Sequence, residues 1–242
     1  MKIIRLLSEA CFRFRRISRL ALKIFATAYD FVVGAEDYLE HHAAEARIHY
    51  RVAVAHAVRE VQTTDHFFAA NIEEGKVCGI ALCTSPWKGL LAGSWAGHMS
   101  ELVRALHGVF PRMPGIMGPP DEAVSFAHLW CDLTGMHPAE GISERWYVLD
   151  ELTMPMAVPG EMMTATEAHL DTVTAWMEAF WEEAGLHDAV DARTQSMRAV
   201  ERGLFHFWCV DGTPVAMAGH SGPVAKLVSI GPVYTDPQHR RK

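Results

Sequence analysis

Residues that could bind a charged ligand gather at the end of the printed sequence, after an apolar stretch at 227–235. Leu, Val, Ile and Tyr predominate in this stretch, which predicts a buried strand. A Gly-Pro pair at 231–232 interrupts it and indicates a bulge or an edge, because proline cannot donate to a strand ladder. An Asp-Pro pair at 236–237 then predicts a turn. Three cations that could pair with phosphate follow this turn: Arg240, Arg241 and Lys242.

The segment V-Y-T-D-P-Q-H-R-R-K at 233–242 resembles the strand-and-loop segment of the GNAT superfamily of acyl-CoA-dependent N-acyltransferases. That family's pattern is hydrophobic-x-V/T-x-P-x-x-R/Q-x-x-G-x-G/A, and Pro237 and Arg240 fall in register with it. The first glycine of the pattern would follow Lys242, so we expect a chain cut off before its phosphate-binding glycines. Such a turn points backbone N–H groups at a phosphate, and in the family it holds the pyrophosphate of coenzyme A. The alternative interpretation of the basic run is a solvated tail.

The resemblance implies transfer of an acetyl group from acetyl-CoA to the amine of a small molecule or peptide, by direct attack on the thioester. It implies that the cofactor arm pairs with the backbone of Val233, Tyr234 and Thr235, and that Arg240, Arg241 and Lys242 reach its phosphates. A backbone N–H near Val233 would stabilise the oxyanion. The stretch 227–235 holds no Glu, which leaves the general base unassigned. His220 and Tyr234, each acting through a water, are the candidates.

The acceptor pocket implied by the resemblance is lined by residues 180–189. Glu182, Glu183 and Asp188 make this region acidic, which would favour a cationic amine. A solvated helix end explains the same charges without any function.

Composition limits the possible classes of protein. The 242 residues, half of them apolar, suffice for one large domain or two smaller ones, and the net charge of −7 argues against general nucleic-acid binding. Five cysteines without a C-x-x-C pair do not indicate a disulfide framework, so we expect a reducing, cytoplasmic location. No apolar run is long enough to span a membrane, and no membrane partner is expected. The seven Lys and Arg residues among the first 23 could form a targeting or membrane-surface segment, or the basic face of a strand at 2–6 and a helix from Ser8.

Periodicity and turn residues predict an α/β fold with a mixed sheet. The first part is expected to begin with helical structure over 30–60, followed by strands at 66–72 and 76–83 that are joined by a turn at 73–75. A strand at 90–95, a helix at 99–110 and a short inner strand at 115–117 come next. A helix then runs from an Asp121 N-cap to about Leu133, where Gly135 stops it, and a strand at 145–149 and a linker at 155–160 follow. In the second part the expected elements are a strand at 161–165, a helix that opens with a Thr164–Glu167 capping box and ends at Gly185, a helix from Asp188 to Gly203, strands at 204–210 and 214–219 joined by a turn at 211–213, and the strand from Leu227.

The two parts resemble each other at an offset of 138 residues, at which Gly93 falls on Gly231. We therefore predict two tandem GNAT-like units: a degenerate one at 1–152, a linker at 153–160, and an incomplete acetyltransferase domain at 161–242. At this offset Arg240 falls on Leu102, and residues 94–105 contain no phosphate loop. Chance agreement of two short hairpins is the alternative.

His41, Glu45 and His49 recur at helical spacing and could present metal ligands on one helix face. No second set of ligands is recognisable nearby, so we expect no metal and favour a polar, solvated face.

Two functions remain open from the sequence. One is an N-acyltransferase that is inactive as truncated; the other is a non-catalytic binding or scaffold protein of the same fold. We expect this chain to bind acetyl-CoA weakly or not at all, because the phosphate-binding glycine turn is missing. We also expect low stability, because the final strand is left with an unpaired edge.

Overall fold

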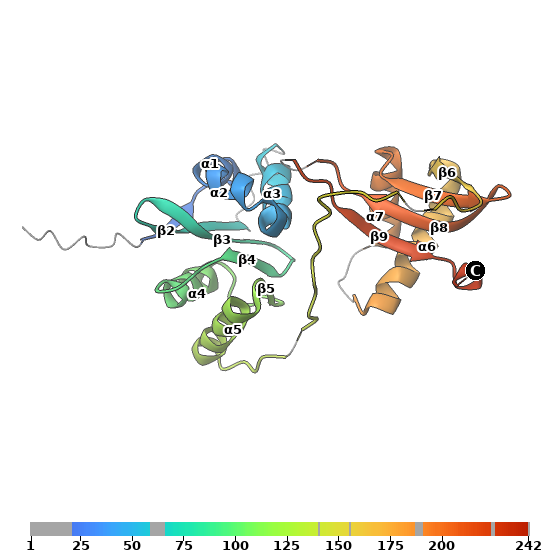
Figure 1. Cartoon of the computed structure of the whole chain (residues 1–242). Coiled ribbons are helices and arrows are strands. Elements are labelled where there is room, and N and C mark those ends of the chain that lie inside the picture. Colours follow the sequence, from blue (N-terminus) through green and yellow to red (C-terminus); the bar gives the residue numbers. More distant parts are fainter. Residues whose placement is uncertain are drawn as a thin grey trace, which may run out of the picture. The chain divides into compact units, whose positions relative to one another are not determined.

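The computed structural model describes residues 21–58, 66–139, 141–154, 156–186, 191–223 and 226–241. The chain divides into two compact units, Met1–Glu144 and Arg145–Lys242, each with its own sheet (Figure 1). Both units combine helices with a sheet, so the predicted α/β class is confirmed. Within the described ranges, no helix is long and apolar enough to cross a bilayer. The predictions for residues 2–6, Ser8 and Asp188 lie outside these ranges.

The first unit contains a five-stranded mixed sheet with strand order β1-β2-β3-β4-β5. Neighbours are antiparallel except for β4 and β5, which run parallel. The predicted hairpin is confirmed, with Glu74 and Gly75 at positive φ in its turn. The predicted short strand at 115–117 also forms, but it lies at the edge of the sheet rather than inside it. The strands are β1 (Ala21–Phe25), β2 (His66–Glu73), β3 (Lys76–Thr84), β4 (Gly89–Gly93) and β5 (Ile116–Met117).

Helices cover both faces of this sheet (Figure 1). One face carries α1 (Ala28–Gly34), α2 (Glu36–His41) and α3 (Ala43–Ala57), so the helical stretch predicted at 30–60 is present as three pieces. The other face carries α4 (Met99–Val109) and α5 (Pro120–Thr134), packed over Trp95. Asp121 is not the N-cap of α5 as predicted. Pro119 is, because Pro120 suits the first helical position and leaves Asp121 in the first turn.

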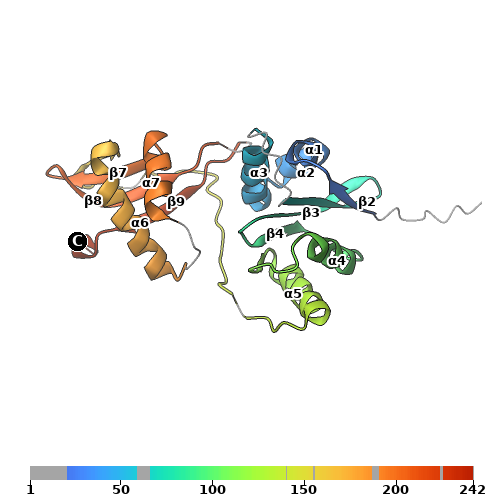
Figure 2. The same cartoon turned by 180° about the vertical axis from the view of Figure 1, so that it is seen from behind.

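The second unit contains an antiparallel four-stranded sheet with strand order β6-β7-β8-β9. Helices α6 (Leu170–Ala184) and α7 (Ala192–Glu201) pack on one face of it (Figure 2). The two-residue turn Asp211-Gly212 is tighter than the predicted turn at 211–213, because Thr213 already belongs to β8 and both turn residues adopt positive φ. The strands are β6 (Glu161–Thr164), β7 (Phe205–Val210), β8 (Thr213–His220) and β9 (Ile230–Thr235), and short 3-10 helices span Glu167–His169 and Pro237–His239.

Two helix starts in this unit differ from the prediction. Thr164 cannot cap α6, because it still belongs to β6, where it pairs with His206. The capping box instead joins Thr166 and His169, whose Nδ1 lies 3.1 Å from the Thr166 backbone N. Helix α7 is capped by Asp191, whose carboxylate accepts from the Thr194 N–H at 2.9 Å.

The strand predicted at 145–149 is wrong. This segment is extended but has no partner in a ladder, and Tyr147 and Leu149 are 86% and 72% exposed. The apolar character that suggests a strand is local, whereas a strand also needs a hydrogen-bonded neighbour. Both units contain three consecutive antiparallel strands, β2-β3-β4 and β7-β8-β9. The tandem interpretation and the bounds 1–152, 153–160 and 161–242 stay predictions.

Candidate functional site

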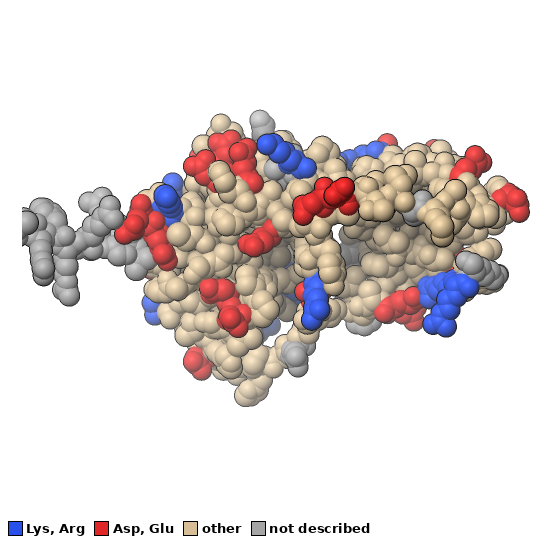
Figure 3. Space-filling model, in the orientation of Figure 1, with Lys and Arg blue, Asp and Glu red and all other residues tan. Residues whose placement is uncertain are grey.

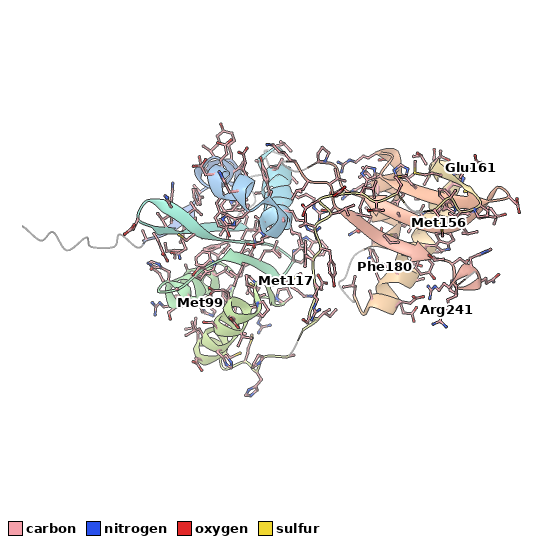
Figure 4. The ribbon with its side chains drawn as sticks, viewed as in Figure 1. Met99, Met117, Met156, Glu161, Phe180 and Arg241 are labelled. Carbon is pink, nitrogen blue, oxygen red and sulfur yellow. The ribbon has the colours of Figure 1, made fainter. Side chains whose placement is uncertain are left out.

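A cavity of about 410 Å³ lies where the end of β9 meets the end of α6. It gathers four of the six residues that the sequence analysis assigns to cofactor binding. Arg241 is exposed beside it with φ of 62°, and Lys242 lies outside the described residues. Figure 4 labels Phe180 and Arg241 at this end of the unit. The lining residues are Phe180, Glu183, Ala184, Val233, Tyr234, Thr235 and Arg240.

Side chains that share one side of α6 form one wall of the cavity. Trp176 packs on Phe207 and Tyr234, with ring centroids 5.5 and 5.7 Å apart. Phe180 and Glu183 follow at i+4 and i+7, so they lie on the same side of the helix toward its C-terminus. Gly185 then ends α6 in the left-handed conformation, as predicted.

The turn after β9 places the second wall. Asp236 accepts from the Gln238 N–H at 2.8 Å and caps the short 3-10 helix Pro237–His239. This turn brings Arg240 back beside the strand, where its Nε donates to the Thr235 carbonyl oxygen at 2.9 Å. The Arg240 guanidinium lies 5.2 Å from the centroid of the Tyr234 ring, a cation–π contact.

Arg240 is also paired with Glu183 across the cavity. Its Nη2 donates to both carboxylate oxygens, at 2.9 and 3.0 Å. Lys and Arg side chains gather beside acidic ones at this end of the unit (Figure 3). Burial and the Glu183 carboxylate raise the pKa of Tyr234, so its phenol is protonated and can donate a hydrogen bond at neutral pH.

The backbone of β9 offers alternate residues to its open edge, because β9 is the last strand of its sheet. The Asp236 N–H donates to the Val215 carbonyl oxygen at 3.0 Å. The alternation of an antiparallel ladder therefore directs the backbone groups of Tyr234, which lies opposite Met217, toward β8. Those of Val233 and Thr235 face the open edge, where the Thr235 carbonyl oxygen is already engaged by Arg240 Nε. Tyr234 thus lines the cavity with its side chain, and the backbone groups available to a ligand there are those of Val233 and the Thr235 N–H.

Of the two side chains considered as a base, the structure brings only Tyr234 to the cavity. The ring of His220 instead stacks on His206, with centroids 5.2 Å apart and planes 9° apart. Glu183 was foreseen only as part of an acidic region, not as a partner of Arg240. The sequence does place Glu183 three residues after Phe180 on the apolar helix that carries Trp176, and this spacing indicates the same side of the helix.

The corresponding strand end of the first unit has different chemistry. There the Trp95 N–H donates to the Glu122 carboxylate at 3.0 Å. The interpretation of the first unit as a degenerate copy stays a prediction.

The three residues predicted to share one solvated helix face lie on two helices: His41 ends α2 and is exposed, as is Glu45 on α3, whereas His49 on α3 is only 4% exposed. His41 Nδ1 lies 2.7 Å from the Asp37 carbonyl oxygen. Across the described parts of the chain, no group of three or more His, Cys, Asp or Glu side chains is placed to hold a metal ion.

No family model matches the chain, and no curated protein does. Among solved structures, the chain is similar to an acetyltransferase of the GNAT family from Colwellia psychrerythraea, with 9% identity, a TM-score of 0.43, and coverage of 91% of this chain and 80% of that one. It is also similar to the aminoglycoside acetyltransferase meta-AAC0020 from an uncultured soil metagenomic sample, in complex with sisomicin. There the identity is 11%, the TM-score is 0.27, and the coverage is 54% of this chain and 97% of that one.

Proposed function

We propose that the second unit binds an acyl-CoA thioester, acetyl-CoA in the first instance, along the open edge of β9 and transfers its acyl group to an amine. The observation that supports this is the cavity itself. It joins the outward-facing backbone of Val233, the Thr235 N–H, a phenol and a guanidinium within one small space. These residues fit the donor, because its arm carries amides that a strand edge can pair with and its far end carries phosphates.

Each group has a distinct task in this proposal. The backbone of Val233 pairs with the amides of the arm as a neighbouring strand would, and its N–H stabilises the oxyanion of the tetrahedral intermediate. Arg240 pairs with a phosphate. The neutral amine nitrogen attacks the thioester carbon, the C–S bond breaks, and the leaving thiolate takes a proton from the Tyr234 phenol. The proton that the nitrogen loses passes through water to the Tyr234 phenolate. Tyr234, which is protonated at neutral pH, suits this donation better than the role of base.

A titration with coenzyme A tests the proposed binding mode. We expect weak binding, with backbone amide shifts centred on residues 233–235 in two-dimensional NMR spectra. Arg240→Ala should weaken this binding about tenfold, as loss of a charge-assisted hydrogen bond does. Arg241→Ala is the matched control, because Arg241 is exposed next to the cavity but does not line it. Equal effects of the two substitutions, or shifts centred elsewhere, would contradict the proposal.

A second measurement separates an enzyme from a binding module of the same fold. One observation favours the module: both carboxylate oxygens of Glu183 are already engaged by Arg240, so the cavity presents no unpaired carboxylate to remove the amine's proton. Release of free thiol from acetyl-CoA in the presence of primary amines, dependent on Tyr234, supports the transferase. Binding without amine-dependent thiol release supports the module.

A further inference from the structure

The charge of the cavity is balanced within the protein. Both oxygens of the Glu183 carboxylate accept from Arg240 Nη2, and both residues line the cavity. The Glu183 side chain remains 50% exposed and the Arg240 side chain 39% exposed, so the pair is in contact with solvent. A cavity with one internal cation and one internal anion attracts neither an anionic nor a cationic ligand strongly.

We propose that the Glu183 carboxylate occupies the anion-binding side of Arg240 only until an anionic ligand binds there. The ligand displaces Glu183 from Arg240, and the released carboxylate then binds the ammonium group of a cationic acceptor. Naming these ligands as the phosphate of the acyl donor and the acceptor amine rests on the proposed function. The exchange itself concerns any phosphoryl anion and any alkylammonium ion.

The contacts of Arg240 allow this exchange without loss of its position. Its Nε is held by the Thr235 carbonyl oxygen, and its guanidinium lies on the Tyr234 ring, so Nη2 can change partners while the side chain stays in place. A phosphate carries more charge and more acceptor oxygens than a carboxylate, and an exposed ion pair competes with it weakly.

The position of Glu183 makes its release easy and its next partner predictable. It lies on the last turn of α6, two residues before the Gly185 cap. The carbonyl end of a helix dipole disfavours a carboxylate, so the helix does not hold Glu183 against Arg240. Once released, it is an unpaired anion within the cavity that favours a cation.

The exchange predicts positive coupling between the two kinds of ligand. An anion on Arg240 frees the carboxylate for an ammonium ion, and an ammonium ion on Glu183 frees Arg240 for an anion. Because the coupling is thermodynamic, it has the same magnitude in both directions.

Inorganic pyrophosphate and butylammonium chloride, titrated at constant ionic strength, test this coupling. The Nε–H resonance of Arg240 reports on anion binding directly. Glu183→Gln should bind pyrophosphate about fivefold more tightly than the unmodified chain, because a competing charge within contact distance is removed. Glu182→Gln is the matched control, since Glu182 is an exposed acid on the same helix turn that does not line the cavity, and it should change the affinity less than about twofold.

In the unmodified chain, saturating pyrophosphate should raise the affinity for butylammonium about fivefold, and Glu183→Gln should abolish this effect. Equal effects of the two substitutions, weaker pyrophosphate binding by Glu183→Gln, or coupling that survives this substitution would each overturn the inference. So would the absence of pyrophosphate binding to all three proteins up to about 10 mM. Coupling without any acyl transfer would reject the proposed function alone, whereas acyl transfer without coupling would reject only the exchange.

Discussion

The most informative perturbation of the first unit is a change of pH, because one histidine there is almost fully buried. His49 on α3 is only 4% exposed, and among the described residues neither ring nitrogen has a hydrogen-bond partner of normal geometry. Burial lowers its pKa to about 4, and the nearby Leu90 backbone opposes this shift only weakly. The side chain is therefore neutral in the folded protein at pH 7.

The sign of the pH effect follows from the two pKa values. An unfolded histidine has a pKa of about 6.5, so between that value and about 4 the unfolded state binds a proton that the folded state does not. The free energy of unfolding should therefore be constant with respect to His49 above pH 6.5 and fall as the pH decreases toward 4. A shift of this size corresponds to a loss of about 3 kcal/mol.

Amide hydrogen exchange of peptides from β3 and β4, corrected for the intrinsic pH dependence of exchange, measures this loss in the first unit separately from the second. His49→Met should remove about 3 kcal/mol of the stability difference between pH 7 and pH 4, because methionine fills similar space and does not titrate. His137→Met, at an exposed position of the same unit, should leave the difference unchanged. Equal pH dependence in the His49→Met variant and the unmodified chain would refute the reasoning.

Two further outcomes follow from the packing of the first unit. Gly93→Ala should lower its unfolding free energy by about 3 kcal/mol in urea denaturation, because Gly93 has φ of 68° and a Cβ there would collide with the Tyr38 hydroxyl and the Cys78 carbonyl oxygen. A variant as stable as the parent would show that the strand adapts at no cost. Cys83, which is buried and whose pKa burial raises to about 11, should resist a thiol reagent at pH 8 until urea is added, whereas the partly exposed Cys78 should react in the native state. Similar labelling rates at both positions would argue against the described burial.

Local signals explain which elements could be predicted. The hairpin turn depends on Gly75 and the helix end on Gly185, which both adopt positive φ without steric cost, so neighbouring residues suffice to define them. The strand predicted at 145–149 would need a hydrogen-bonded neighbour, and the residues of this segment do not indicate whether such a neighbour exists. The start of α6 was misplaced for the same reason, since only the pairing of Thr164 with β7 keeps that residue in the sheet.

The residues of the candidate site also include some that local patterns predict and some features that only the folded structure shows. Val233, Tyr234 and Thr235 are contiguous and Arg240 follows one turn later, so a sequence pattern alone could assign them to one segment. Which backbone groups of that segment are open depends on the register with β8, and this could not be predicted from the stretch itself.

Local patterns predict the order of most helices and strands and the segment that carries the cations, because hydrophobic period and turn chemistry act between close neighbours. The contact of Glu183 with Arg240 is visible only in the folded chain, since these residues are 57 positions apart and meet through the packing of α6 on β9. The folded chain also shows that His49 is buried and that His220 lies away from the cavity. Such contacts depend on how the apolar faces of helices and sheets pack against each other. The order of charged residues along the chain does not indicate which surface a given side chain will contact.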